Sequence, residues 1–233
     1  MAKRKKKRKS KPLIPFHGDY IWVETKEGAF WRRKRGTVKP VKLNDSFKKN
    51  TITAKVAGPA AKRTLAKLNP FISHLLKRRI TNRFINLFIK TFNQKGSLGF
   101  SLFVGAEIQE DFPLSSILAV YRVTKTKSEV VVKIEIDDST IIRKSPLVTD
   151  YYFELILIHG DPTKEKSLKT ETTVSKLFPL IKKVKPSVCS LSIVLPGNKK
   201  PWMVFLKVNC HEGNEPAIHA RHYGMKVVAA GDK

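Results

Sequence analysis

The chain has 233 residues, 41% of them hydrophobic, which is too apolar for a wholly disordered chain and long enough for one or two domains. Its net charge of +27 is concentrated at the front, because residues 1–95 hold 27 Lys and Arg against four acidic residues, whereas residues 96–233 hold 19 against 15. No run of about eighteen apolar residues occurs and no apolar segment follows the basic N-terminus, so the sequence predicts neither a membrane span nor a secretory signal.

Residues 1–18 are predicted to be a flexible basic arm, since a run of like charge repels itself and cannot stabilise a compact fold. Each phosphate that such an arm neutralises releases counterions, which gives strong binding without sequence choice. A tail that only improves solubility is the alternative. We favour a polyanion partner, and expect phosphate contacts from Lys3, Arg4, Lys5, Lys6, Lys7, Arg8, Lys9 and Lys11.

The stretch "DYIWVETKEGAFWRRK" predicts a β-hairpin, with strands at 20–24 and 29–33 around a turn that ends at Gly28. Trp22 and Trp31 would lie on one side of this ribbon. Aromatic rings beside Arg can stack on unpaired bases, but large aromatics are more often buried, and we favour packing for these rings. The adjacent basic cluster is the better candidate for phosphate contact, and consists of Arg32, Arg33, Lys34 and Arg35.

Residues 36–56 are predicted to be an extended connector, in which Asn44–Ser46 could cap a short helical turn. The segment "GPAAKRTLAKL" is typical of a helix start with Pro59 in its first turn. Asn69 and Pro70 would cap and begin a second helix.

This helical region is predicted to run to about Gln94. One face carries Ile80, Phe84, Leu87, Phe88 and Phe92, and the opposite stripe carries Arg79, Arg83, Asn86 and Lys90. The apolar face would pack on the rest of the protein and leave the stripe facing outward. We expect phosphate contacts from Arg79, Arg83 and Lys90, with an ordinary solvated face as the alternative. Binding to a membrane surface is less favoured, because Pro70 and the aromatics suit a core.

After Gly96 the apolar period changes to two, which predicts strands. We expect them near 100–104, 117–124, 129–136, 151–159, 188–195, 201–209 and 223–229. Seven short strands with polar breaks indicate an antiparallel β-sandwich. Residues 172–186 are ambiguous, since Pro179 argues against one continuous helix.

Four segments carry a resemblance, and they occur in a fixed order: "KEGAFWRRK" (26–34), "NDSFKKN" (44–50), "AAKRTLAKL" (60–68) and "RITNRF" (79–84). Together with the later "PWMVFLKVNC" and "GMKVVAA", the chain resembles a family of small, uncharacterised proteins of Bacteroidota-type bacteria. The basic arm departs from that pattern. The resemblance implies a bacterial cytoplasmic or mobile-element protein rather than a nuclear one, and it carries no activity, cofactor or binding residue.

No catalytic signature is recognisable. Cys210, His211, His219 and His222 do not fit a common zinc spacing, and two cysteines make no disulfide framework. Asp137 and Asp138 follow a strand, where Asp is favoured in turns, and Glu107–Asp111 resembles a loop surface. There is no phosphate-binding Gly-rich loop. We therefore expect no enzyme activity, no metal and no cofactor.

Together these features predict an α+β protein: a basic arm (1–18), a basic hairpin plus helical region (19–95) and a mainly antiparallel β-sandwich of about seven strands (96–233). The predicted function is cytoplasmic, non-enzymatic binding of nucleic acid, DNA or RNA, through its phosphates. The alternatives are a capsid-like structural protein whose arm packages nucleic acid, or a ribosome-associated adaptor. In the cell, the protein is expected to associate with the nucleoid, the ribosome or a virion. The sequence also allows it to form a homo-oligomer.

Overall fold

The computed structural model describes residues 20–25, 28–33, 45–77, 79–142, 145–180, 185–197 and 200–232. Within them the protein is α+β, β-rich and mostly antiparallel, as the sequence predicts. The basic arm, and with it Lys3 to Lys11, lies outside the described residues. The chain divides into two compact units, 1–47 and 48–233.

In the first unit, β1 (Tyr20–Thr25) and β2 (Gly28–Arg33) form an antiparallel hairpin, which confirms the prediction. Trp22 lies directly opposite Trp31, and their ring centroids are 5.1 Å apart. Residues directly opposite each other in an antiparallel pair project to the same face, so the two rings share one side of the ribbon. Phe30 is exposed.

Helix α1 begins earlier than predicted, at Asp45, and runs to Leu68. The expected connector over 45–56 is therefore helical, and Pro59 lies inside the helix rather than in its first turn. Proline in a helix interior removes one backbone hydrogen bond and usually marks a helix end, which is why the sequence suggests a later start. The buried face of α1 carries small and apolar residues, Ala57, Ala60, Ala61, Thr64, Leu65 and Leu68.

Asn69 and Pro70 do not begin the second helix. They belong to a short 3₁₀ turn, η1 (Asn69–Phe71), that continues from α1, and α2 begins only at Ile80 and ends at Lys95. Gly96 closes α2 in the left-handed conformation (φ 69°), where its N–H donates to the Phe92 carbonyl. The predicted apolar face is confirmed at Ile80, Phe84 and Phe88, which are buried.

The larger sheet has the strand order β10-β9-β5-β6, with β11 on β9 and β7 on β5. Its centre is β9 paired with β5 over ten residues, and both strands are buried along most of their length because both faces of the sheet are covered. Its strands are β5 (Asp150–His159), β6 (Lys169–Val174), β7 (Phe178–Pro179), β9 (Trp202–Glu212), β10 (Glu215–Pro216) and β11 (Gly224–Gly231).

The smaller sheet has the order β3-β4-β8, from β3 (Tyr121–Lys125), β4 (Glu129–Ile136) and β8 (Ser187–Val194). In β4 every second residue is buried, namely Val130, Val132, Ile134 and Ile136, which produces one apolar face. Short 3₁₀ turns connect the strands elsewhere: η2 (Ser101–Phe103), η3 (Leu114–Ser116), η4 (Glu165–Ser167) and η5 (Ala220–His222).

Two strand predictions differ from the structure, and one further strand is not predicted. The expected strand at 100–104 is the turn η2, because Phe100 and Phe103 are spaced by three and pack together against Phe88 of α2. The strand predicted over 117–124 begins only at Tyr121. Strand β6 is missed because it is a polar, largely exposed edge strand with no alternating apolar pattern.

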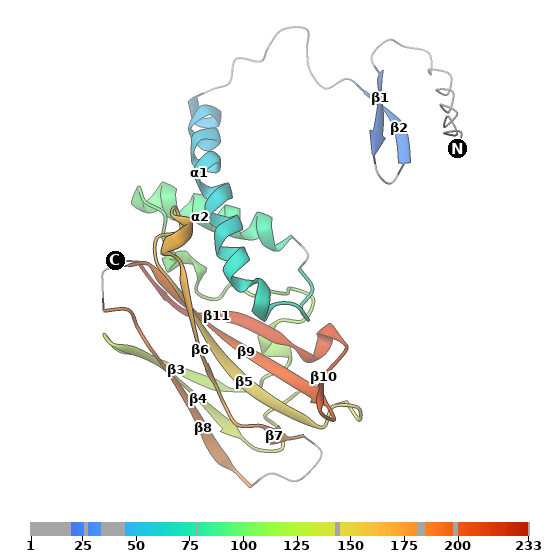
Figure 1. The fold of residues 1–233 in the computed structure, drawn as a ribbon, viewed down its shortest axis with the longest axis vertical. Helices are drawn as coiled ribbons and strands as arrows, with labels where there is room; N and C mark the ends of the chain where they lie inside the picture. The colour runs from blue at the N-terminus through green and yellow to red at the C-terminus, as the bar shows by residue number, and fades with distance from the viewer. Residues whose placement is uncertain are drawn as a thin grey trace, which may run out of the picture. The chain divides into compact units, whose positions relative to one another are not determined.

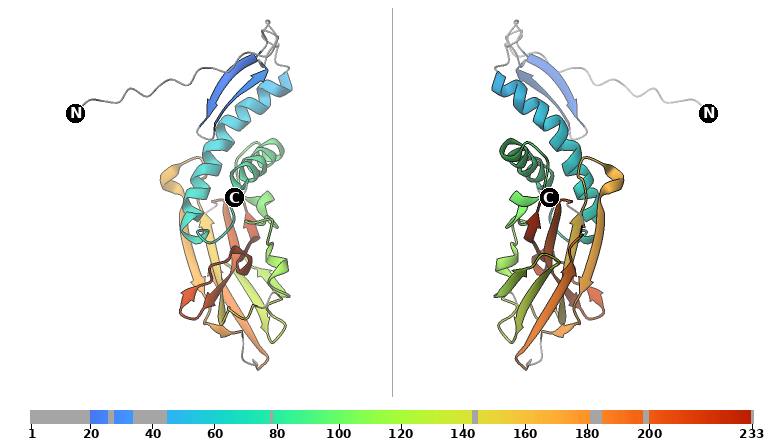
Figure 2. Two further views of the ribbon diagram at one scale, coloured as in Figure 1. Left: turned by 90° about the vertical axis from the view of Figure 1, so that its right-hand side faces the viewer. Right: turned by 90° about the vertical axis from the view of Figure 1, so that its left-hand side faces the viewer.

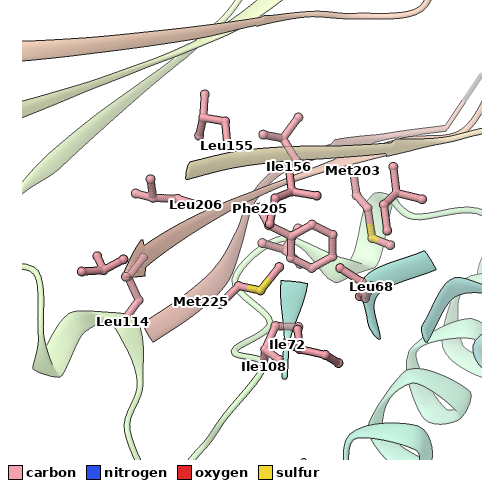
Figure 3. Close-up of a cluster of buried hydrophobic side chains, with 14 of the residues drawn as sticks. Leu68, Ile72, Ile108, Leu114, Leu155, Ile156, Met203, Phe205, Leu206 and Met225 are labelled. Atoms are coloured by element: carbon pink, nitrogen blue, oxygen red, sulfur yellow. The ribbon is translucent and has the colours of Figure 1, made fainter. Parts of the chain in front are cut away.

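The helices, the larger sheet and the smaller sheet of the second unit form three layers (Figure 1). Two further views show the helices on the opposite side of the larger sheet from β3, β4 and β8 (Figure 2). Successive residues of a strand project to opposite faces. Accordingly Phe205 and Met225 lie toward Leu68 and Ile72, whereas Leu206 projects to the other side (Figure 3).

The structure differs from the predicted division at 95/96. The compact units divide at 47/48, so most of the helical region shares one unit with the strands. The reason is packing: Phe84 and Phe88 of α2 form an aromatic cluster with Phe103, and the same continuous core includes Met203 and Phe205 of β9.

Candidate nucleic-acid interface

The predicted phosphate-binding residues are described only in part. Lys34 and Arg35 lie, like the arm, outside the described residues. Arg32 and Arg33 lie at the end of β2, opposite Ile21 and Tyr20.

Arg83 departs from the predicted outward stripe. Its guanidinium donates to the carbonyls of Glu107 and Ile108, both at 2.6 Å, and lies 3.2 Å from the Glu110 carboxylate. The side chain is only 22% exposed. Arg83 therefore fastens α2 to the loop over 107–110 and is occupied within the protein.

The rest of the stripe remains at the surface. Lys90 and Asn86 are exposed on α2, and Arg79 is exposed immediately before it. Arg79 has a left-handed backbone (φ 53°), an uncommon conformation for a residue with a side chain. Neither Arg79 nor Lys90 makes an ion pair with any other described residue.

Four further cations that sequence reasoning did not single out are exposed on the helices and their connection: Lys55, Lys62, Lys67 and Lys77. They too make no ion pair within the described part of the chain. The sequence contains a signal for them, because no Asp or Glu occurs between Asp45 and Glu107 while twelve Lys and Arg do. We call Lys55, Lys62, Lys67, Lys77, Arg79 and Lys90 the helical basic surface.

A shallow groove of about 270 Å³ lies within this surface, between the end of α1 and the start of α2. Lys62 and Lys77 line it together with Asn69 and Thr81. Ammonium, amide and hydroxyl groups of this kind are the usual donors to phosphate oxygens. The groove therefore presents donors and positive charge, with no acidic residue in its lining.

Two other cations of the region are held by the fold. Lys95 donates to the Asp232 carboxylate at 2.7 Å, and Arg63 donates to the Thr163 carbonyl at 2.7 Å. These bonds tie α2 to the C-terminal end of the chain and α1 to the loop before η4. The helical basic surface consists of the exposed cations that are not held in this way.

Two of the acidic side chains considered for catalysis, Asp137 and Glu107, serve local structure. Asp137 accepts from the N–H and the hydroxyl of Ser139, and these bonds hold its pKa below the usual range. Burial raises the pKa of Glu107, against the opposing effects of its bond from the Leu114 N–H and of the Lys226 ammonium at 3.5 Å. Among the described residues no group of three or more His, Cys, Asp or Glu is placed to hold a metal ion.

Comparisons with protein-family models, with curated proteins and with solved structures give no match, and the resemblance to a bacterial family stays a prediction. No helix among the described residues is long and apolar enough to cross a membrane.

Proposed function

We propose that the protein is a non-enzymatic, cytoplasmic nucleic-acid-associated protein that contacts the phosphate backbone with little sequence choice. Its described contact area is the helical basic surface, and the arm and hairpin cluster continue it in the sequence. Arg83 is left out of this area because the loop over 107–110 already holds it.

One observation carries the proposal. The chain between Asp45 and Glu107 contains no acidic residue, and six of its cations are exposed without an ion pair to a described residue. Uncompensated like charge destabilises a compact protein, and it attracts polyanions. A bound phosphate chain would remove the repulsion and release counterions at the same time.

The test is the salt dependence of binding to mixed-sequence DNA and RNA. We expect the logarithm of the association constant to fall linearly with the logarithm of salt concentration between roughly 50 and 200 mM. A variant with Lys55, Lys62, Lys67 and Lys77 changed to Gln should have a shallower slope, by about 0.9 for each duplex phosphate that it no longer neutralises. Gln preserves helix propensity and removes repulsion between the lysines, so thermal stability should not fall.

A matched control removes the same charge elsewhere, with Lys127, Lys133, Lys164 and Lys169 changed to Gln. These lysines are also exposed but belong to the β-strands and their loops. The control should retain most of the wild-type slope. If both variants lose the same amount of slope, binding depends on net charge alone and not on the helical basic surface. If the affinity of the wild-type protein does not depend on salt concentration, the proposal is wrong.

A capsid-like structural role is the second candidate. Strand β8 forms an edge of the smaller sheet and exposes Val188 (63%) and Val194 (67%), which would favour contact between copies. Light scattering at high protein concentration, with and without nucleic acid, distinguishes the two candidates. A monomer or dimer under both conditions rules out a shell.

A further inference from the structure

A second, more enclosed pocket lies on the helix-facing side of the larger sheet. It measures about 220 Å³, and strands β5 and β9 form its floor with Tyr152, Glu154, Lys207 and Asn209. The connection between α1 and α2 closes one side with residues 70–74. Pockets for drug-sized ligands measure about 300–1,000 Å³, so this one suits a single small ring system.

The floor holds a largely buried ion pair that has spare hydrogen-bonding capacity. Lys207 and Glu154 lie opposite each other in the β5–β9 pairing, with side chains only 6% and 12% exposed. The ammonium lies 3.6 Å from the carboxylate, which exceeds a hydrogen bond, and no other acceptor among the described residues reaches it. An ammonium has three donors, so Lys207, which lines the pocket beside Glu154, can donate to a bound ligand.

Glu154 has unused capacity as well. Its Oε2 accepts from the Asn209 amide at 3.3 Å, and that oxygen is also the one nearest Lys207. A carboxylate has two oxygens and about four acceptor positions, so Oε1 can still receive donors. Burial lowers the pKa of Lys207, and the Glu154 carboxylate opposes that shift. The floor therefore offers a donor beside an acceptor.

Aromatic rings line the walls. The His74 ring lies nearly parallel to Tyr223, with centroids 5.2 Å apart, and His211 meets Tyr152 edge to face at 5.4 Å. Phe71 contributes a further ring. Ring walls of this type accept a flat π system.

We propose that this pocket binds one guanine base. The Watson–Crick edge of guanine presents the O6 acceptor beside the N1–H and N2–H donors. Lys207 would donate to O6, and the Glu154 carboxylate would accept from N1–H and N2–H. The other bases lack two adjacent donors beside a carbonyl oxygen, so the carboxylate would engage them with one bond at most.

The guanine can belong to a free nucleotide or to an unpaired residue of a strand. The latter case rests on the proposed function, and the chain makes it reachable. His74 lines the pocket, and Lys77, three residues later in the same connection, lines the basic groove. A strand whose phosphates follow the groove would thus pass close to the pocket.

The first experiment titrates the protein with GMP, AMP, CMP and UMP, followed by calorimetry. All four nucleotides carry the same phosphate group, so a difference in their affinities is caused by the base. We expect one GMP per chain, with the other nucleotides roughly tenfold weaker or more. Equal affinity for all four, a preference for another base, or no binding overturns the proposal.

The double variant Glu154→Gln with Lys207→Met removes both charges, because removing one partner alone would leave the other buried and unpaired. We expect it to lose the GMP preference. Its control, Lys133→Met with Glu135→Gln, changes the same residue types on the exposed side of β4 and should bind GMP like wild type. Unchanged GMP binding by the pocket variant overturns the proposal.

If the pocket variant does not fold, wild-type protein provides the test. An amine-acylating reagent followed by peptide mass spectrometry should show GMP protecting Lys207 but not the exposed Lys200. Protection of neither lysine, or of both equally, contradicts the pocket assignment.

Oligonucleotides separate the two sources and the two proposals. A thymidine strand with one unpaired guanine should bind more tightly than an all-thymidine strand if the base comes from nucleic acid, and equally if only free nucleotide enters. If the protein binds GMP but shows no salt-dependent binding to oligonucleotides, the proposed function is wrong and the guanine pocket is still supported. If oligonucleotides bind in a salt-dependent way but the protein shows no preference for guanine, the pocket assignment is wrong and the proposed function is still supported.

Discussion

Single side chains at the C-terminal end of the chain hold the start of the β region in place. The Asp232 carboxylate accepts from the Phe100 and Ser101 N–H groups at 2.6 and 3.0 Å and from Lys95 at 2.7 Å. A Cβ added at Gly99 would lie 2.1 Å from the same carboxylate, so a side chain there would displace it. One residue therefore secures both η2 and the end of α2.

The first prediction is that Asp232→Ala lowers the free energy of unfolding by about 1–3 kcal/mol, because it leaves backbone donors and an ammonium without their acceptor. Urea denaturation measures the change. Asp111→Ala is the control, since Asp111 is exposed and has no hydrogen bond or ion pair with a described residue. Equal stability of the two variants would contradict the role assigned to Asp232.

The same carboxylate gives a pH dependence with a definite sign. Burial acts to raise the pKa of Asp232, but bonds from Lys95, Ser101 and Phe100 outweigh it and hold that pKa below its ordinary value. The stability that Asp232 contributes is thus fully present above the unfolded pKa and lost as pH falls through the folded one. The stability gap between wild type and Asp232→Ala should narrow only below about pH 4.

Substitutions at Arg79 can distinguish the effect of backbone strain on stability from the effect of charge on binding. An L-residue in the left-handed conformation costs roughly 1 kcal/mol, and Asn tolerates that conformation better. Arg79→Asn should therefore be more stable than Arg79→Ala, while both lose the same polyanion affinity. Thermal melts and salt titrations of the pair check both halves. Equal melting temperatures would show that the backbone at this position is relaxed.

At the scale of elements, helix α1 contains two residues that lower its stability. Gly58 and Pro59 stand side by side in its interior, and both are poor helix formers. A Cβ at Gly58 would meet nothing within 4 Å. Pro59 is exposed, and as a proline it cannot donate to the Lys55 carbonyl one turn earlier.

Accordingly, Pro59→Ala should raise the free energy of unfolding by about 1–3 kcal/mol, and Gly58→Ala by about 1 kcal/mol. Denaturant unfolding of each variant provides the measurement. Both gains require a continuous helix through these positions. A drop in stability in Pro59→Ala would mean that the proline sets a bend on which the packing of Ala60 and Ala61 depends.

The elements that the sequence predicts correctly are those whose pattern is local. Strand β4 and the apolar face of α2 repeat with clean periods of two and 3.6, so neighbouring residues suffice. The start of α1 is hidden by Pro59, and β6 is stabilised by its pairing with β5 rather than by its own composition. The contacts of Arg83 could not be predicted from the local sequence pattern, because its partners lie 24 or more residues away in the chain.

Across the whole molecule, charge and fold are separated along the chain. Residues 96–233 are nearly balanced, whereas the front carries almost the entire excess. The fold uses a few front cations, such as Arg83 and Lys95, and leaves the helical basic surface unpaired among the described residues. The pattern is expected if the β-rich part provides stability and the front provides an electrostatic contact area.

The last prediction follows from that separation. Deleting residues 2–12 removes eight Lys and Arg, and should weaken nucleic-acid binding and lower its salt slope by about 0.9 for each duplex phosphate that the arm neutralises. The melting temperature should stay nearly the same, since a like-charged run adds repulsion rather than packing. Replacing the same segment with a Gly/Ser sequence of equal length controls for length. If either change lowers the melting temperature substantially, the arm is part of the folded structure, and the separation of charge from stability does not hold.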